Sequence, residues 1–188
     1  MTAERALAAV LLAAFALPSG AIELSGGADY GAGTAWADGQ RAPSQGVLIH
    51  GALTPLTFVL GGSVRTAERK PADLQGSWLF GVGFRTNPWP WASLEVLGIA
   101  ASQSWTTTDV NLRGWYGPTR RTGALGARVQ ATAGPRLGQP TEWVKLRPFV
   151  GLAWTSTFAR RDHDRLRTWG GPVHGFEASL GVEFIYER

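Results

Sequence analysis

The stretch Ser179-Leu180-Gly181-Val182-Glu183-Phe184-Ile185-Tyr186, close to the C-terminus, decides the fold. Side chains of a β-strand point alternately to its two faces. One face of this stretch and of the residues just before it is apolar, and consists of Phe176, Ala178, Leu180, Val182, Phe184 and Tyr186. The other face is small or charged, and consists of Gly175, Glu177, Ser179, Gly181 and Glu183. The alternation predicts a strand with lipid on one side and a polar interior on the other.

Seven stretches upstream show similar alternation, so we expect an all-β fold, an eight-stranded antiparallel up-and-down transmembrane β-barrel over residues 22–188. The expected strands cover 22–36, 46–53, 56–66, 76–85, 91–105, 121–133, 143–158 and a final strand that begins near Val173. The second of these is short. The fifth is ambiguous in its second half, because Leu97 and Ile99 fall on the same face as Glu95.

The connections and the aromatic residues favour a membrane barrel. Short or Pro/Gly-rich joints at 54–55, 87–90 and 134–142 alternate with longer polar joints at 37–45, 67–75, 106–120 and 159–172. This alternation is typical of outer-membrane barrels, in which periplasmic turns are short and extracellular loops are long. Aromatic residues fall near both sets of joints, as two interfacial girdles require. The periplasmic set is Trp89, Trp91, Trp143 and Tyr186, and the outer set is Trp36, Trp78, Trp105, Phe158 and Trp169.

The composition and the N-terminus limit where the protein acts. A length of 188 residues suits one domain, and the absence of cysteine excludes disulfides and thiol chemistry. Residues 1–21 are expected to be a signal peptide, because the apolar run from Ala6 to Leu17 precedes Pro18 and small residues. That run is too short to span a bilayer as a helix. We therefore expect export to the bacterial outer membrane. The net charge of +4 could indicate binding to nucleic acid, but we expect no nucleic-acid partner for an exported chain.

Two motifs resemble a known family. The run Leu146-Arg147-Pro148-Phe149-Val150-Gly151-Leu152-Ala153 is similar to the seventh strand of small barrels of the OmpA/OmpX/Opa type. Gly181, Phe184 and Tyr186 resemble the C-terminal signal that the barrel-insertion machinery reads. The resemblance implies that this machinery is a partner of the chain, which we expect to be a monomer. The chain departs from the family in ending Glu187-Arg188 after the last aromatic residue. Pro148 also removes one ladder hydrogen bond.

The polar face predicts a network of charges inside the barrel. The interior of an eight-stranded barrel is just wide enough for side chains, and buried charges there need partners. The expected lumen network is Glu23, Asp29, Glu95, Arg128, Lys145, Arg147, Glu177 and Glu183. A soluble lipocalin-like barrel would place the apolar face inside instead. Charges of both signs suit a plugged lumen better than a cup for a hydrophobic ligand.

The outer joints are rich in arginine, whose planar guanidinium binds phosphate in a bidentate manner. Lipid A phosphates lie at that height in the outer leaflet, so we expect contact with outer-membrane lipid, in particular lipopolysaccharide. The candidates are Arg120, Arg121, Arg160, Arg161, Arg165 and Arg167. The alternative is a solvated rim, because Asp109, Asp162 and Asp164 are interspersed with these arginines.

Catalytic and metal sites are not expected, and no cofactor is implied. His174 and Ser179 fall on opposite strand faces, and no His-x-Ser pair occurs on one strand face. The triplet Asp162-His163-Asp164 could bind a metal only if a tight loop brought its side chains together. We therefore expect a non-enzymatic structural or surface-interaction protein. The alternatives are a narrow ion or small-solute pore, a lipid A-modifying enzyme, and a soluble lipocalin-like ligand-binding barrel.

Overall fold

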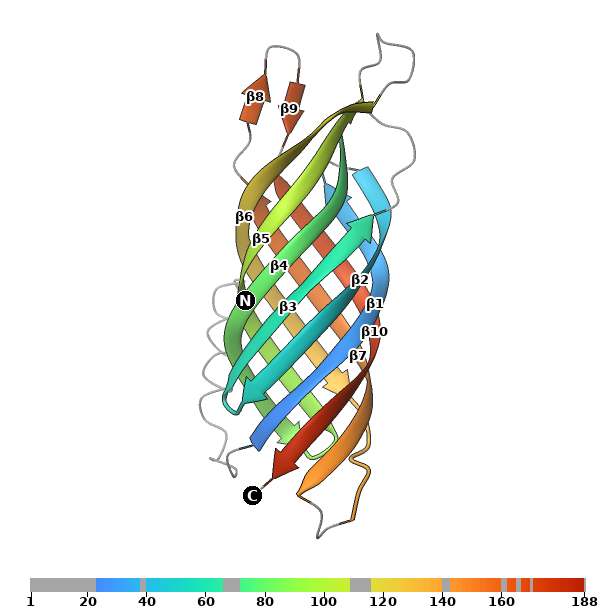
Figure 1. Cartoon of the computed structure of the whole chain (residues 1–188), viewed down its shortest axis with the longest axis vertical. Helices are drawn as coiled ribbons and strands as arrows, with labels where there is room; N and C mark the ends of the chain where they lie inside the picture. Colours follow the sequence, from blue (N-terminus) through green and yellow to red (C-terminus); the bar gives the residue numbers. More distant parts are fainter. Residues whose placement is uncertain are drawn as a thin grey trace, which may run out of the picture.

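The computed structural model describes residues 23–37, 40–65, 72–108, 116–139, 143–159, 162–164, 167–169 and 171–187. Within these residues eight antiparallel strands close into a barrel in the order β1-β10-β7-β6-β5-β4-β3-β2, beside a two-stranded sheet of β8 and β9 (Figure 1). The barrel strands are β1 (Glu23–Ala37), β2 (Gln40–Leu53), β3 (Leu56–Arg65), β4 (Ala72–Trp89), β5 (Ala92–Thr108), β6 (Tyr116–Ala133), β7 (Val144–Ala159) and β10 (Pro172–Glu187). The predicted fold class is confirmed.

The barrel has two distinct ends. At one end, which we call the turn end, Thr54 and Pro55 join β2 to β3, Pro90 and Trp91 join β4 to β5, and residues 134–143 join β6 to β7. The strand termini at Glu23 and Glu187 lie at this end (Figure 1). The opposite end, the loop end, carries the remaining joints and the hairpin of β8 (Asp162–Asp164) and β9 (Arg167–Trp169). In the described parts of the chain, no helix is long and apolar enough to cross a membrane.

Several strands are longer than predicted. The second does not begin at Gly46: it begins at Gln40, and pairs such as Trp36 with Arg41 continue the β1–β2 ladder. The fourth runs from Ala72 through the predicted turn to Trp89, and the sixth begins at Tyr116. Alternation of apolar residues stops at these ends, whereas backbone hydrogen bonding between neighbouring strands does not depend on side-chain polarity. The predicted signal peptide, residues 1–21, lies outside the described residues.

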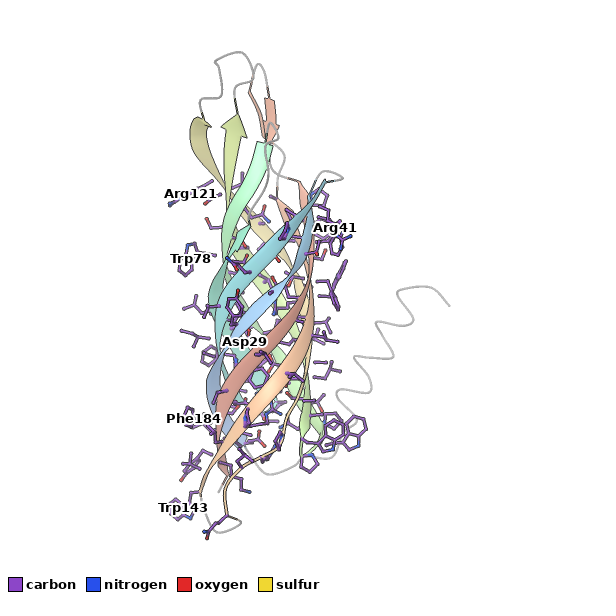
Figure 2. All side chains as sticks on the ribbon, turned by 90° about the vertical axis from the view of Figure 1, so that its right-hand side faces the viewer. Asp29, Arg41, Trp78, Arg121, Trp143 and Phe184 are labelled. Atoms are coloured by element: carbon purple, nitrogen blue, oxygen red, sulfur yellow. The ribbon has the colours of Figure 1, made fainter. Side chains whose placement is uncertain are left out.

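The apolar face points outward and the polar face inward. Leu180 on the outward face of β10 is 66% exposed, whereas Glu183 and Ile185 on its inward face are 0% exposed. The outward residues project from the ribbon all round the barrel, with Trp78 and Phe184 as examples in Figure 2. This orientation is the reverse of a lipocalin-like cup. The ambiguous half of β5 is also settled, since Leu97 and Ile99 are buried inside.

Inward glycines let neighbouring strands approach closely. A Cβ atom added at Gly83 on β4 would overlap the carbonyl oxygen of Val96 on β5. The space around Gly123 on β6 is different, because a Cβ there would meet no heavy atom within 4 Å beyond its two neighbours in the chain. Of the 25 glycines, some are therefore required because neighbouring strands leave no room for a Cβ atom, whereas others are not.

We expect Gly83→Ala to lower the free energy of unfolding by about 1–3 kcal/mol, because β4 and β5 must move apart to admit the methyl group. Urea unfolding of the barrel refolded in phospholipid vesicles measures the change. Gly123→Ala is the matched control and should leave the stability within about 0.5 kcal/mol of the starting protein. Equal stability of the two variants would contradict the close approach at Gly83.

Candidate functional site

The predicted lumen residues do lie inside the barrel. Glu23, Asp29, Glu95, Arg128, Arg147 and Glu183 are buried, and Lys145 and Glu177 are half-buried. They come from five strands, namely β1, β5, β6, β7 and β10. Along these strands the inward positions alternate with outward positions. The inward strand positions therefore bring these charged residues together in the lumen, which is the candidate site.

Glu183 lies at the centre of the charges near the turn end. Its Oε2 accepts a hydrogen bond from Arg85 Nη2 at 2.9 Å and forms an ion pair with Arg147 Nη2 at 2.6 Å. Arg85 Nη1 also bonds Glu183 Oε1 and lies 3.5 Å from Glu95 Oε1. Arg147 is the direct cross-strand neighbour of Glu183, but Arg85 belongs to β4, four strands away from β10 in either direction around the ring. The Arg85–Glu183 pair thus spans the lumen.

A second group of charges lies further toward the loop end. Arg128 Nη1 donates to Glu177 Oε2 at 3.0 Å and to Thr155 Oγ1 at 2.9 Å. Arg128 Nε donates to Gln130 Oε1 at 3.2 Å, and Gln130 Nε2 in turn donates to Asp29 Oδ2 at 3.4 Å. One chain of hydrogen bonds therefore connects β10, β6 and β1 across the interior.

A third contact closes the turn end. Arg136, in the connection after β6, donates from Nη2 to Glu23 Oε2 at 2.8 Å and from Nε to the Pro90 carbonyl oxygen at 2.7 Å. Asn87 Nδ2 donates to Glu23 Oε1 at 3.1 Å. These bonds attach the β6–β7 connection and the end of β4 to the first residue of β1.

Apolar side chains also lie inside the barrel. Leu48, Val59, Leu79, Leu97 and Ile99, from β2 to β5, form a buried cluster. Phe149 is buried on the opposite side, where a Cβ at Gly181 would overlap its ring. Gly181 thus has a packing role inside the barrel, besides its place in the predicted insertion signal. The interior therefore holds both a network of charges and a cluster of apolar side chains.

Sequence reasoning missed two members of the network. Arg85 was not named, although it follows Trp78, Phe80, Val82 and Phe84 in strict alternation and must therefore point inward. Arg136 carries no such signal, because it lies in an irregular connection. Some buried polar atoms of the described residues have no protein hydrogen-bond partner, among them Asp29 Oδ1, Ser179 Oγ and Arg147 Nη1.

The other residues of the predicted insertion signal lie at the turn end. Phe184 is exposed on the outward face, and Tyr186 packs edge-on against Trp143 with ring centroids 6.3 Å apart. Trp89 and Trp91 stack 5.3 Å apart at the same end. Toward the loop end, Trp36 and Trp154 lie 5.9 Å apart. The side chains of Trp105 and Trp169 lie outside the described part of the structure.

The arginines proposed to contact lipopolysaccharide are only partly described. Arg121 is exposed on β6 near the loop end (Figure 2). Arg120 belongs to β6 and Arg167 to β9, but nothing is described of their side chains. Arg160, Arg161 and Arg165 lie outside the described residues. Their convergence on a ligand therefore stays a prediction.

A serine and a histidine pair on the outer wall, and the sequence did not predict this pair. Ser156 Oγ and His174 Nδ1 share a hydrogen bond of 3.0 Å, and the His174 ring stacks on Trp154 at 5.9 Å. Among the described side chains, no carboxylate contacts His174 to orient it as a base. The pair serves as part of the aromatic packing between β7 and β10.

The residues of the possible metal triplet, Asp162-His163-Asp164, form strand β8 and not a tight loop. Within the described part of the chain, no three or more His, Asp or Glu side chains gather in an arrangement that could hold a metal ion.

Comparison with known proteins supports the fold. Ail, the attachment invasion locus protein of Yersinia pestis, solved with the heparin analogue sucrose octasulfate, aligns with a TM-score of 0.56 at 12% identity, over 89% of this chain and 100% of Ail. Neisserial surface protein A gives 0.47 at 12% identity over 85% and 95%, and the N-terminal β-barrel domain of Pseudomonas aeruginosa OprF gives 0.39 at 14% over 85% and 97%. No protein-family model and no curated protein sequence matches.

At 12% identity, the likeness to Ail shows the fold alone. That fold is the closed eight-stranded antiparallel barrel of small outer-membrane proteins, as the resemblance in the sequence implied.

We expect Glu183→Gln to lower the free energy of unfolding by about 3–5 kcal/mol, because Arg85 and Arg147 would then be buried without their counter-charge. Urea unfolding in phospholipid vesicles measures the loss. The triple variant Arg85→Met, Arg147→Met, Glu183→Leu removes all three charges and should recover most of it. A loss under about 1 kcal/mol for Glu183→Gln, as for an exposed pair, would contradict the central role of this carboxylate.

Proposed function

We propose that this protein is an integral β-barrel of the bacterial outer membrane, exported by its signal peptide and inserted through the machinery that reads its C-terminal strand. Its role is structural or surface-interacting and not enzymatic, and the basic loops at its outer end contact lipopolysaccharide. The observation that carries the proposal is the apolar outward face of a closed sheet, which surrounds an interior that holds a network of buried charges.

The outward face has the chemistry of a surface in lipid. Large apolar residues on every barrel strand except β5 are about half-exposed or more, for example Leu24, Ile49, Leu60, Phe80 and Leu152. In water an apolar surface of this extent would drive association. A closed barrel satisfies its own backbone hydrogen bonds, which hydrocarbon requires. Aromatic pairs near the two ends fit the two membrane interfaces.

The filled lumen favours a structural role over conduction. Arg85 and Glu183 pair across the lumen near the turn end, and the cluster of Leu48, Val59, Leu79, Leu97 and Ile99 is buried inside β2 to β5. Because these ion pairs and apolar side chains lie in the lumen, transport would require them to rearrange. Surface interaction requires no such change, and the loops at the outer end are where this chain concentrates arginine.

The loop end faces outward in this proposal. The signal peptide exports the chain, and both strand termini then stay on the periplasmic side with the short turns. Arg121 on β6 and the arginines of the β7–β10 connection are placed near the lipid A phosphates. The likeness to Ail adds no binding property to this chain, but the sulfated sugar in that complex is a convenient soluble anion for competition.

We expect replacement of Arg160, Arg161, Arg165 and Arg167 by glutamine to weaken binding of lipopolysaccharide about tenfold or more, because charge-assisted bonds to phosphate are lost. Binding is measured with detergent-solubilised barrel on immobilised lipopolysaccharide, and sucrose octasulfate should compete for the starting protein.

Asp162→Asn with Asp164→Asn is the matched control, since it changes the same connection with the opposite sign of charge. This variant should bind as well as the starting protein or more tightly. Unchanged binding after loss of the four arginines would refute the loop contact and leave the membrane barrel unaffected.

A further inference from the structure

A shallow groove interrupts the outer wall between β1 and β5. Its volume is about 770 Å³, and the side chains along it include Tyr30, Gln45, Val47, Ile49, Leu60 and Trp78. The groove exists because glycine replaces a bulky residue in the outward rows. Gly62 lies between Val47 and Trp78 in the cross-strand register, and Gly76 faces outward on the next strand.

The groove is polar at its upper edge and apolar below. Tyr30 Oη donates a hydrogen bond of 2.9 Å to Gln45 Oε1. From Gln45, β2 runs down toward the turn end through Val47 and Ile49, which share its outward face. An elongated molecule in the groove would therefore meet polar atoms near the loop end and hydrocarbon further in.

Arg41 stands above this polar edge. It lies four residues before Gln45 on the same face of β2, about 13 Å away along the strand. Its guanidinium carbon is 5.9 Å from the centroid of the Trp36 ring, which holds the exposed side chain against the wall (Figure 2). Among the described residues, no carboxylate pairs with Arg41. The wall thus presents a cation, then a hydroxyl–amide pair, then an apolar trough.

We propose that this wall binds one molecule of lipid A from the outer leaflet, with a phosphate at Arg41, polar linkage atoms at Tyr30 and Gln45, and an acyl chain along Val47 and Leu60. The inference rests on the proposed outer-membrane location and adds to the loop contact a defined site on the barrel itself. The order of cation, polar pair and apolar trough matches the order of groups along an acylated, phosphorylated lipid.

A second copy of the chain fits this surface less well. The acidic residues whose side chains are described, Glu23, Asp29, Glu95, Glu177 and Glu183, all lie on inward-facing strand positions. The described outer wall of a second barrel would therefore offer Arg41 no counter-charge, whereas a lipid phosphate supplies one. Charge complementarity favours the lipid.

Native mass spectrometry tests the proposal by measuring which lipid the barrel retains. The full-length mature barrel is extracted from the outer-membrane fraction and refolded with lipid A and phosphatidylethanolamine. We expect one retained lipid A per barrel. Val47→Trp fills the trough and Arg41→Ala removes the cation, and each should lower lipid A occupancy about tenfold, while Arg41→Lys should retain most of it.

Val150→Trp is the matched control, because Val150 on β7 is as exposed as Val47, at 57% against 53%, and lies away from the groove. It should retain lipid A normally. Equal retention by all variants, retention of phosphatidylethanolamine instead of lipid A, or a dimer that Val47→Trp dissociates would each overturn the proposal. A barrel found outside the outer membrane would show, separately, that the proposed location is wrong.

Discussion

The carboxylate of Glu183 lies between the guanidinium groups of Arg85 and Arg147, and the orientation of the whole barrel depends on this buried contact. Side chains alternate along a strand, so Glu183 inside requires Phe184 and Val182 outside. A shift of one residue in the register of β10 would place Glu183 in lipid, and Val182 and Phe184 in the lumen. Since Arg85 and Glu183 belong to strands on opposite sides of the ring, one ion pair constrains both halves of the sheet.

The interior combines this charged network with the apolar cluster of Leu48, Val59, Leu79, Leu97 and Ile99. Arg85, Arg147 and Glu183 are buried, and electrostatic attraction between charges is stronger away from water. A buried pair contributes little beyond the cost of removing its charges from water, but loss of one partner is strongly destabilising. The network therefore fixes which residues face inward more than it adds to stability. Its packing is also what makes a surface role more consistent with the structure than conduction.

The sequence contained most of the fold because alternation is local. The faces of β10 and β4 follow from Leu180 to Glu183 and from Trp78 to Arg85, and the same parity could have identified Arg85 as a lumen residue. Strand ends were less predictable, since the β1–β2 ladder continues past the alternating region to Gln40. Arg136 could not be inferred because no period governs an irregular connection. The Ser156–His174 pair and the outer groove depend on register between strands, which a single sequence does not specify.

The central claim is that the apolar outward face lies in an outer membrane while the charge network lies in the lumen. The most direct test is the electrophoretic mobility in SDS of the protein extracted from the outer-membrane fraction, compared with and without boiling. A closed barrel leaves no unpaired strand edge for the detergent to attack, so the account predicts a compact unheated band that shifts on boiling. A protein that fractionates as soluble and shows a single mobility under both conditions would contradict the account.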